Sequence, residues 1–217
     1  MSDAPVVAPG FTYTGLDTVG NRYSELASGS VTHKRDIDLT SASVARLIDR
    51  SGNIGADGTT VWLSFIFRMD ANANSYGLVN WYRDGSEIGG VGDDAVGDGT
   101  TNNNYKISGV SEIVNTVRSV SVQTFILVKI DFNTGDDDVT VWFDPVIANG
   151  ETGLDTPDLL SVSAKDQSFD QLAVRFCYAE GNSGTMDVDE IRLGTTLESV
   201  TPIVMESTEV TARETDE

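Results

Sequence analysis

Hydrophobic and polar residues alternate in short runs along most of this chain, and clusters of glycine, asparagine and aspartate separate the runs. Alternation with a period of two is typical of β-strands that bury one face. The clearest run is 60–69, where apolar side chains fall on both faces, which predicts a central strand covered on both sides. Further strands are predicted over 75–83, 125–132, 139–143, 171–178 and 186–193. Strands at this spacing favour an all-β sandwich or barrel.

The runs 125–132 and 139–143 can be placed in register as a hairpin, because 133–138 is rich in turn residues. Antiparallel pairing with one buried face requires the apolar positions of both runs to share that face. We therefore predict that all six apolar residues are buried. The predicted pairs are Phe132 with Val139, Ile130 with Val141, and Val128 with Phe143.

Three segments depart from simple alternation. The parity of the apolar residues changes within 186–193, which predicts a β-bulge near Asp189 and Glu190. Residues 41–50 have apolar side chains at helical spacing after a capping residue, although a strand fits them equally well. One short strand is predicted over 11–14.

The chain divides into three parts by composition. Residues 1–24 are predicted to form an N-terminal arm, since prolines and glycines interrupt them. Residues 25–203 hold the strand pattern and are predicted to form one sandwich domain. Residues 204–217 are rich in glutamate and offer little to a core, so we interpret them as an acidic tail.

Charge and composition exclude several function classes. The chain has 14 basic and 34 acidic residues, a net charge of −20, which disfavours nucleic acid and anionic membranes as partners. No run approaches the length of a membrane span, and the N-terminal residues lack the pattern of a signal peptide. One cysteine excludes an internal disulfide, and one histidine, His33, excludes a histidine-based triad or a multi-histidine metal site.

Three motifs carry a resemblance to a known family. They are Gly55 to Phe65, the hairpin from Val128 through Val141-Trp142-Phe143-Asp144-Pro145, and Met186 to Thr196 with its Asp-Glu-Ile-Arg strand. In this order they resemble the laminin G-like branch of the concanavalin A-like lectin and glucanase domains of bacterial or phage surface proteins. The resemblance covers about residues 25–202 and implies a jelly-roll of two antiparallel sheets, often binding glycans and sometimes calcium.

Glucanases of that family resemble one another in a strand motif of Glu, any residue, Asp, two residues and Glu. The nearest match here is Asp187, Asp189 and Glu190, where the spacing is wrong and the third carboxylate is missing. Retaining enzymes need two carboxylates about 5–5.5 Å apart. We therefore expect no catalytic activity and assign no catalytic residue.

Candidate binding residues fall into two groups. Aromatic rings stack on sugars, and Trp81, Tyr82 and Tyr105 lie in or beside polar, loop-rich sequence, which makes them candidate glycan-binding residues. Calcium prefers oxygen ligands, and Asp93, Asp94 and Asp98 lie in a glycine-rich loop. A second acidic cluster, 136–138, lies at the predicted hairpin tip.

Two functions remain open. In the first, the chain is a structural or decorating subunit on a particle, filament or cell surface, and binds protein subunits or copies of itself. In the second, it is a lectin-like module of a secreted protein that binds polysaccharide. For the first hypothesis, apolar residues near the two termini are the candidate assembly contacts, namely Val6, Val7, Phe11, Ile203, Val204 and Met205.

Overall fold

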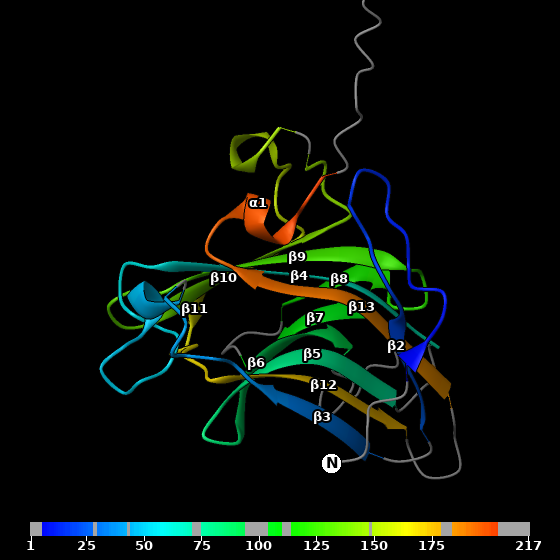
Figure 1. Ribbon diagram of the computed structural model, residues 1–217, viewed down its shortest axis with the longest axis horizontal. Helices are drawn as coiled ribbons and strands as arrows, with labels where there is room; N and C mark the ends of the chain where they lie inside the picture. The colour runs from blue at the N-terminus through cyan, green and yellow to red at the C-terminus, as the bar shows by residue number, and fades with distance from the viewer. Residues whose placement is uncertain are drawn as a thin grey trace, which may run out of the picture.

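The computed structural model describes residues 6–27, 30–42, 44–70, 75–93, 104–109, 114–147, 149–178 and 184–203. These residues form two antiparallel sheets that stack face to face (Figure 1). The seven-stranded sheet runs in the order β1 (Val6–Val7), β2 (Arg22–Ala27), β13 (Gly184–Gly194), β4 (Thr60–Met69), β9 (Thr124–Asp131), β10 (Asp137–Phe143) and β11 (Leu159–Ala164). The six-stranded sheet runs β3 (Ser30–Asp36), β12 (Gln171–Tyr178), β5 (Ser75–Arg83), β6 (Ser86–Asp93), β7 (Asn104–Ser108) and β8 (Val114–Ser119).

The main hydrophobic core lies between the two sheets. It takes alternate residues from each strand, such as Phe65 and Phe67 from β4 and Phe176 from β12, all fully buried. This arrangement follows from the period-two pattern, because successive side chains of a strand point to opposite faces. Among the described residues, helix is confined to short pieces, namely α1 (Leu197–Val200) and two 3₁₀ turns, η1 (Ala45–Leu47) and η2 (Glu151–Gly153). None of the helices in the described ranges is long and apolar enough to cross a membrane.

The predicted strands are confirmed with small changes at their ends. Strands β4, β5 and β12 have the predicted bounds, and β4 lies within its sheet between β13 and β9. The predicted bulge is confirmed as a register shift between Asp189 and Arg192 where β13 pairs with β4. The predicted helix over 41–50 is reduced to the single turn η1, and residues 11–14 form no regular strand.

The hairpin of β9 and β10 is displaced by two residues from the predicted register. Val139 pairs with Ile130, Val141 with Val128, and Phe143 with Ile126. The predicted burial of all six residues is nevertheless confirmed, and Phe132 lies beyond the strand with its amide donating to the carbonyl of Thr59. Parity fixes the register only to within two residues, because a shift of two keeps every side chain on the same face.

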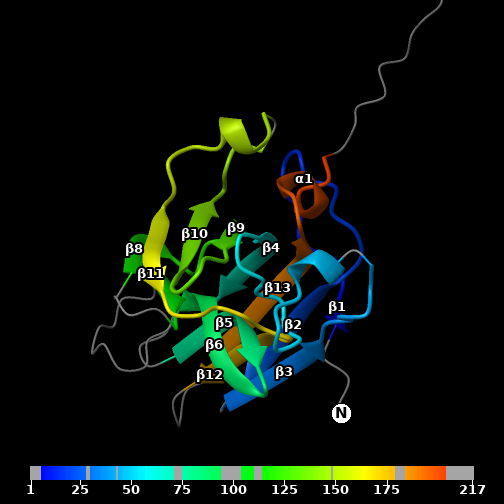
Figure 2. The same ribbon diagram turned by 90° about the vertical axis from the view of Figure 1, so that its left-hand side faces the viewer.

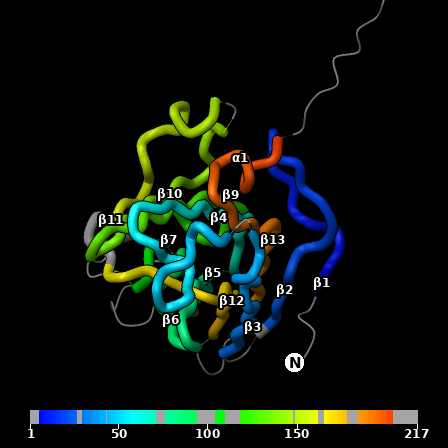
Figure 3. The backbone as a smooth tube through the Cα atoms, turned by 60° about the vertical axis from the view of Figure 1, so that its left-hand side comes forward, coloured from blue at the N-terminus to red at the C-terminus, as the bar shows by residue number. Residues whose placement is uncertain are grey.

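Segments of the chain itself cover the outer face of the seven-stranded sheet. Helix α1 buries Leu197 and Val200 against a cluster that contains Trp62, while the N-terminal segment buries Phe11 and Leu16 against a second one. Figure 2 shows α1 and the β10–β11 connection on this side, and Figure 3 traces the N-terminal segment past β2 and β13. The described part of the predicted arm, residues 6–24, therefore contributes to the sandwich, and the predicted boundary at residue 24 falls inside β2.

Candidate functional site

The outer face of the six-stranded sheet, turned away from the core, carries a group of polar side chains. Val79 and Trp81 of β5 point into the core, so Leu78, Asn80 and Tyr82 point outward. Strand pairing then defines two rows across the sheet. The Asn80 row contains Lys34, Ala173, Asn80, Gly90 and Ser108, and the Leu78 row contains Thr32, Arg175, Leu78, Gly92 and Lys106.

Asn80 is the central residue of this face. Its side chain is fully buried, and neither its amide nitrogen nor its amide oxygen has a hydrogen-bond partner among the described residues. Gly90 and Ala173, which flank Asn80, supply no polar group, and a Cβ at Gly90 would lie 2.7 Å from the Asn80 amide nitrogen. A buried polar group without a partner costs about 1–3 kcal/mol, so such groups are uncommon and call for an explanation.

Arg175 is held beside Asn80 by two neighbours on the same face. Its Nη1 donates to Glu87 Oε2 at 2.5 Å and its Nη2 donates to the Tyr76 hydroxyl at 2.9 Å. Burial acts to lower the pKa of the Arg175 guanidinium, but the interactions with Tyr76 and Glu87 outweigh it and raise the pKa above its usual value. The guanidinium is therefore a fixed positive charge whose orientation these contacts define.

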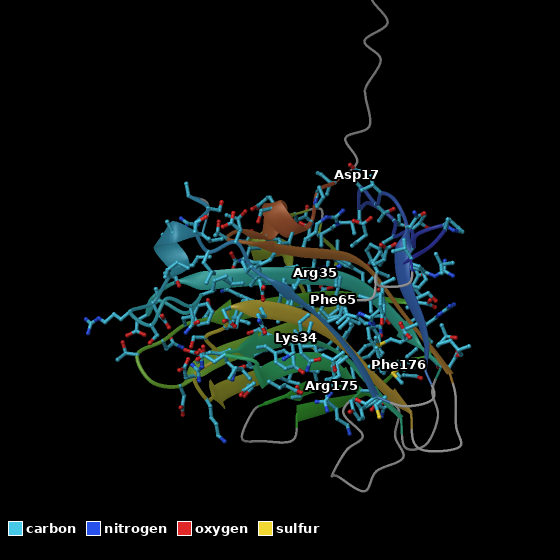
Figure 4. The ribbon with its side chains drawn as sticks, turned by 60° about the horizontal axis from the view of Figure 1, so that its bottom comes forward. Asp17, Lys34, Arg35, Phe65, Arg175 and Phe176 are labelled. Carbon is cyan, nitrogen blue, oxygen red and sulfur yellow. The ribbon has the colours of Figure 1, made fainter. Side chains whose placement is uncertain are left out.

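Lys34 and Tyr82 form a second contact on this face. The Lys34 Nζ lies 3.9 Å from the centre of the Tyr82 ring and donates to the carbonyl of Gly85 at 2.9 Å. Burial raises the pKa of the Tyr82 phenol, and the negative charge of Glu87 raises it further, so the phenol is protonated at neutral pH. Figure 4 labels Lys34 and Arg175 over the six-stranded sheet.

Of the three predicted glycan-binding aromatic residues, one lies on this face. Tyr82 is part of it, whereas Trp81 and Tyr105 are fully buried in the core between the sheets, where a sugar cannot stack on them. Trp81 also donates from Nε1 to Gln167 Oε1 at 2.9 Å. The prediction placed Trp81 outward because it weighed neighbouring polar sequence rather than strand parity, and parity sends Trp81 inward with Val79.

One of the three candidate calcium ligands lies within the described residues. Asp93 is buried at the end of β6, while Asp94 and Asp98 lie outside the described residues. At the hairpin tip, Asp137 turns inward, and its carboxylate accepts from the backbone amides of Asn133 and Gln167. Within the described ranges, no group of three or more His, Cys, Asp or Glu side chains is arranged to hold a metal ion.

A hollow of about 630 Å³ beside this hairpin tip is lined by four aspartates and Arg50. Burial raises the pKa of the Asp137 carboxyl, and the charges of Asp166 and Asp57 raise it further against the two amide hydrogen bonds. Two of the other carboxylates are also engaged, since Asp166 pairs with Arg83 and Asp49 accepts from the amides of Ser51 and Asn53. These contacts give the hollow a role in loop structure.

The candidate assembly contacts also differ in their surroundings. Val6, Val7 and Ile203 are exposed, whereas Phe11 is buried against Ile66 and Phe125. Val204 and Met205 lie outside the described residues. The Phe11 side chain therefore packs within this chain and offers little exposed surface for an assembly contact.

The acidic strand motif lies on the other sheet. Asp187 pairs with Arg22 and Arg68, and Asp189 accepts a hydrogen bond from the amide of Phe11 at 2.6 Å. Both carboxylates are buried. Asp189 holds the N-terminal segment at Phe11, and Asp187 joins Arg22 of β2 to Arg68 of β4.

No protein-family model matches the chain, and no curated protein matches it. Several solved structures are similar in fold. The β-glucanase catalytic domain of glycoside hydrolase family 131 from Podospora anserina aligns with 83% of this chain and 74% of its own, at 10% identity and a TM-score of 0.50.

Two others align less well. The alginate lyase AlgAT5 from Polysaccharide Lyase family 7 has 12% identity and a TM-score of 0.41, with 64% of this chain and 60% of its own covered. The binding domain of botulinum neurotoxin DC, solved with SialylT, has 9% identity and a TM-score of 0.40, with 81% of this chain and 43% of its own covered. This chain thus spans 60% of the lyase.

The likeness to a catalytic domain corrects the prediction that this chain is not an enzyme. That prediction rested on one missing carboxylate in one strand motif. A β-glucanase catalytic domain has this fold at only 10% identity, so the absence of one motif does not exclude catalysis. An identity this low shows the fold alone, and the chain has the fold of the concanavalin A-like jelly-roll sandwiches.

Proposed function

We propose that the outer face of the six-stranded sheet binds a carbohydrate chain, and that the Asn80 amide makes the central contact. The observation that carries the proposal is the buried amide of Asn80, which has no hydrogen-bond partner within the described part of the chain. An asparagine side chain has two donors and an acceptor. Neighbouring hydroxyl groups of a sugar ring offer the complementary acceptor and donors.

The surroundings of Asn80 support this assignment. Gly90 and Ala173 add no bulk on either side of it, while Tyr82 and Arg175 add a ring and further donors. Ligand sites commonly combine apolar or aromatic surface with a few precisely oriented polar groups. A β-glucanase catalytic domain has a similar fold, which is consistent with a carbohydrate ligand for this chain.

Binding at Asn80 requires a local rearrangement. The amide is fully buried in this structure. A ligand reaches it when the long side chain of Lys34, which lies beside Ala173, turns aside on its rotatable stem, while Arg175 keeps its contacts with Glu87 and Tyr76. The backbone of the sheet does not have to move.

The test is the substitution Asn80→Leu, which keeps the branched shape and removes the polar atoms. Binding to a panel of neutral and anionic polysaccharides is measured by titration calorimetry. We expect Asn80→Leu to weaken binding at least tenfold without loss of folding. Unchanged affinity in this variant would overturn the proposal.

The matched control is Ser64→Ala on the outer face of the other sheet. Ser64 is fully buried like Asn80, but its hydroxyl donates to the carbonyl of Val200 at 2.6 Å. Its removal should leave polysaccharide affinity unchanged. The same incubations are assayed for new reducing ends and for unsaturated products, and their release would identify the face as catalytic.

A further inference from the structure

Two rows on the outer face of the six-stranded sheet carry positive charge, although the whole chain is acidic. The chain carries −20. The Asn80 row and the Leu78 row nevertheless contain three cations, Lys34, Arg175 and Lys106, and no described carboxylate. The carboxylates of this face, Asp36 and Glu87, lie one row further along, level with Tyr82.

We infer that the carbohydrate bound here is anionic and carries carboxylate or sulfate groups that contact Arg175 and Lys34. This inference rests on the proposed function, because it names the class of glycan for the same site. An acidic chain that gathers cations around a buried, unpartnered amide has the local chemistry to bind an anionic sugar.

Arg175 has the geometry for this role. Among the described residues, its hydrogen bonds to Glu87 and Tyr76 use one donor on each terminal nitrogen, and a guanidinium has five donors. The remaining donors keep the planar fork that binds carboxylate or sulfate oxygens. The two contacts also hold the guanidinium in place, so less conformational entropy is lost when a ligand binds.

Lys34 lies in the same row as Asn80, and Ala173 lies between them. Neighbouring strands are about 4.8 Å apart, so Lys34 and Asn80 are about 10 Å apart across the sheet. An acidic sugar unit over Ala173 lies between the ammonium group of Lys34 and the amide of Asn80. Its charged group then faces a cation while its hydroxyls face the amide.

The overall negative charge does not prevent such binding at moderate salt. At about 0.15 M ionic strength the screening length is about 8 Å, so distant carboxylates act weakly on a bound polyanion. The cations within the two rows act at contact distance. Binding is therefore measured at that ionic strength.

The experiment compares paired polysaccharides on the full chain by titration calorimetry. Polygalacturonate is paired with its methyl-esterified form, which has the same backbone without the charge. Alginate and a carrageenan represent a second carboxylated polymer and a sulfated one, and laminarin and agarose are neutral. We expect at least one anionic polymer to bind tenfold or more tightly than the neutral polymers.

Two charge variants locate the contact. Arg175→Gln should weaken binding of the anionic polymer at least tenfold, and Lys34→Gln should weaken it about threefold. Arg35→Gln is the control, because it removes one positive charge from the same strand while Arg35 pairs with Leu172, on the opposite parity from Lys34. The affinity of the Arg35→Gln variant for the anionic polymer should stay at the wild-type value.

The outcomes separate the two proposals. Equal binding of charged and neutral polymers, with loss in Asn80→Leu, would overturn the anionic ligand and keep the carbohydrate face. Equal loss in Arg35→Gln and Arg175→Gln would also overturn the anionic contact, since net charge alone would then explain it. Binding to none of the six polymers would overturn the carbohydrate face itself. A preference for carrageenan over alginate would identify sulfate rather than carboxylate as the group.

Discussion

The two sheets of this sandwich differ in what lies on their outer faces. The seven-stranded sheet buries its outer face under segments of the same chain, with Phe11 and Leu16 on one side and Leu197 and Val200 on the other. The six-stranded sheet has none of the three hydrophobic clusters of the described residues on its outer face, and it carries the Asn80 and Leu78 rows instead.

Buried polar groups differ in the same way. On the seven-stranded sheet Ser64 donates to Val200, Asp189 accepts from the amide of Phe11, and Asp187 accepts from Arg22 of the neighbouring strand β2. On the six-stranded sheet Asn80 has no partner among the described residues. One outer face therefore contributes to stability, while the other retains an unmet hydrogen-bonding demand that a ligand can satisfy.

The largest effect is expected from Phe11→Ala. Phe11 is buried against Ile66 and Phe125, and removing a buried phenylalanine ring typically costs about 3 kcal/mol or more. Urea unfolding measures the loss. The control Val6→Ala changes a side chain that is 63% exposed, and it should stay within about 0.5 kcal/mol of wild type. A Phe11→Ala loss as small as that of Val6→Ala would show that the N-terminal segment does not stabilise the sandwich.

A second test on the same sheet is Asp187→Asn measured against pH. Burial acts to raise the pKa of the Asp187 carboxyl, but hydrogen bonds from Ser24, Arg68 and Arg22 outweigh it and hold the pKa below its usual value. The ionised group therefore stabilises the fold above about pH 4, and this contribution is lost as the pH falls through the folded-state pKa. We expect a cost of about 2 kcal/mol at pH 7 that shrinks at pH 3. A cost independent of pH would contradict the ion-pair account.

The comparison becomes sharpest in the pair Ser64→Ala and Asn80→Leu. Ser64→Ala removes a satisfied hydrogen bond and leaves the Val200 carbonyl without it, so unfolding free energy should fall by about 1 kcal/mol. Asn80→Leu removes an unsatisfied amide, so stability should rise by about 1 kcal/mol while carbohydrate binding falls. Thermal unfolding of the two variants measures whether stability falls in Ser64→Ala and rises in Asn80→Leu. A fall in stability for both variants would mean that Asn80 is satisfied in solution.

The smallest effect is expected from Lys34→Met. The variant keeps the apolar stem and loses the ammonium group over the Tyr82 ring, a contact of about 0.5 kcal/mol at a partly exposed site. Chemical denaturation should show a change no larger than this. A loss above about 1.5 kcal/mol would make Lys34 a structural residue of this sheet.

Most of the fold follows from patterning that is local in the sequence. The strands β4, β5 and β12 were predicted from local apolar runs and the bulge of β13 from a change of parity, since such patterns indicate strands directly. The β9–β10 register was wrong by two residues, because parity is unchanged by such a shift. Residues 41–50 were predicted as helix or strand with equal weight, and the only regular element there among the described residues is the turn η1, since tertiary contacts hold the apolar side chains without a full helix.

The site was less predictable, because it depends on which strands are neighbours. Tyr82 was identified, but Arg175 and Lys34 come from β12 and β3, whose pairing with β5 joins distant parts of the chain. Asn80 had a local signal, namely one amide within an otherwise apolar strand face between Leu78 and Tyr82. Its lack of a partner is visible only when Gly90 and Ala173 are placed beside it.

Gly90 and Ala173 give the two flanks of Asn80 different capacities for evolutionary change. A methyl group at Gly90 would meet the Asn80 amide nitrogen at 2.7 Å and the Val79 carbonyl at 2.9 Å, so mutational drift on the β6 flank is blocked. Ala173 already has its Cβ, and a serine there adds one hydroxyl beside the same amide. Related chains that select different sugars should therefore vary at the position of Ala173 and keep glycine at that of Gly90.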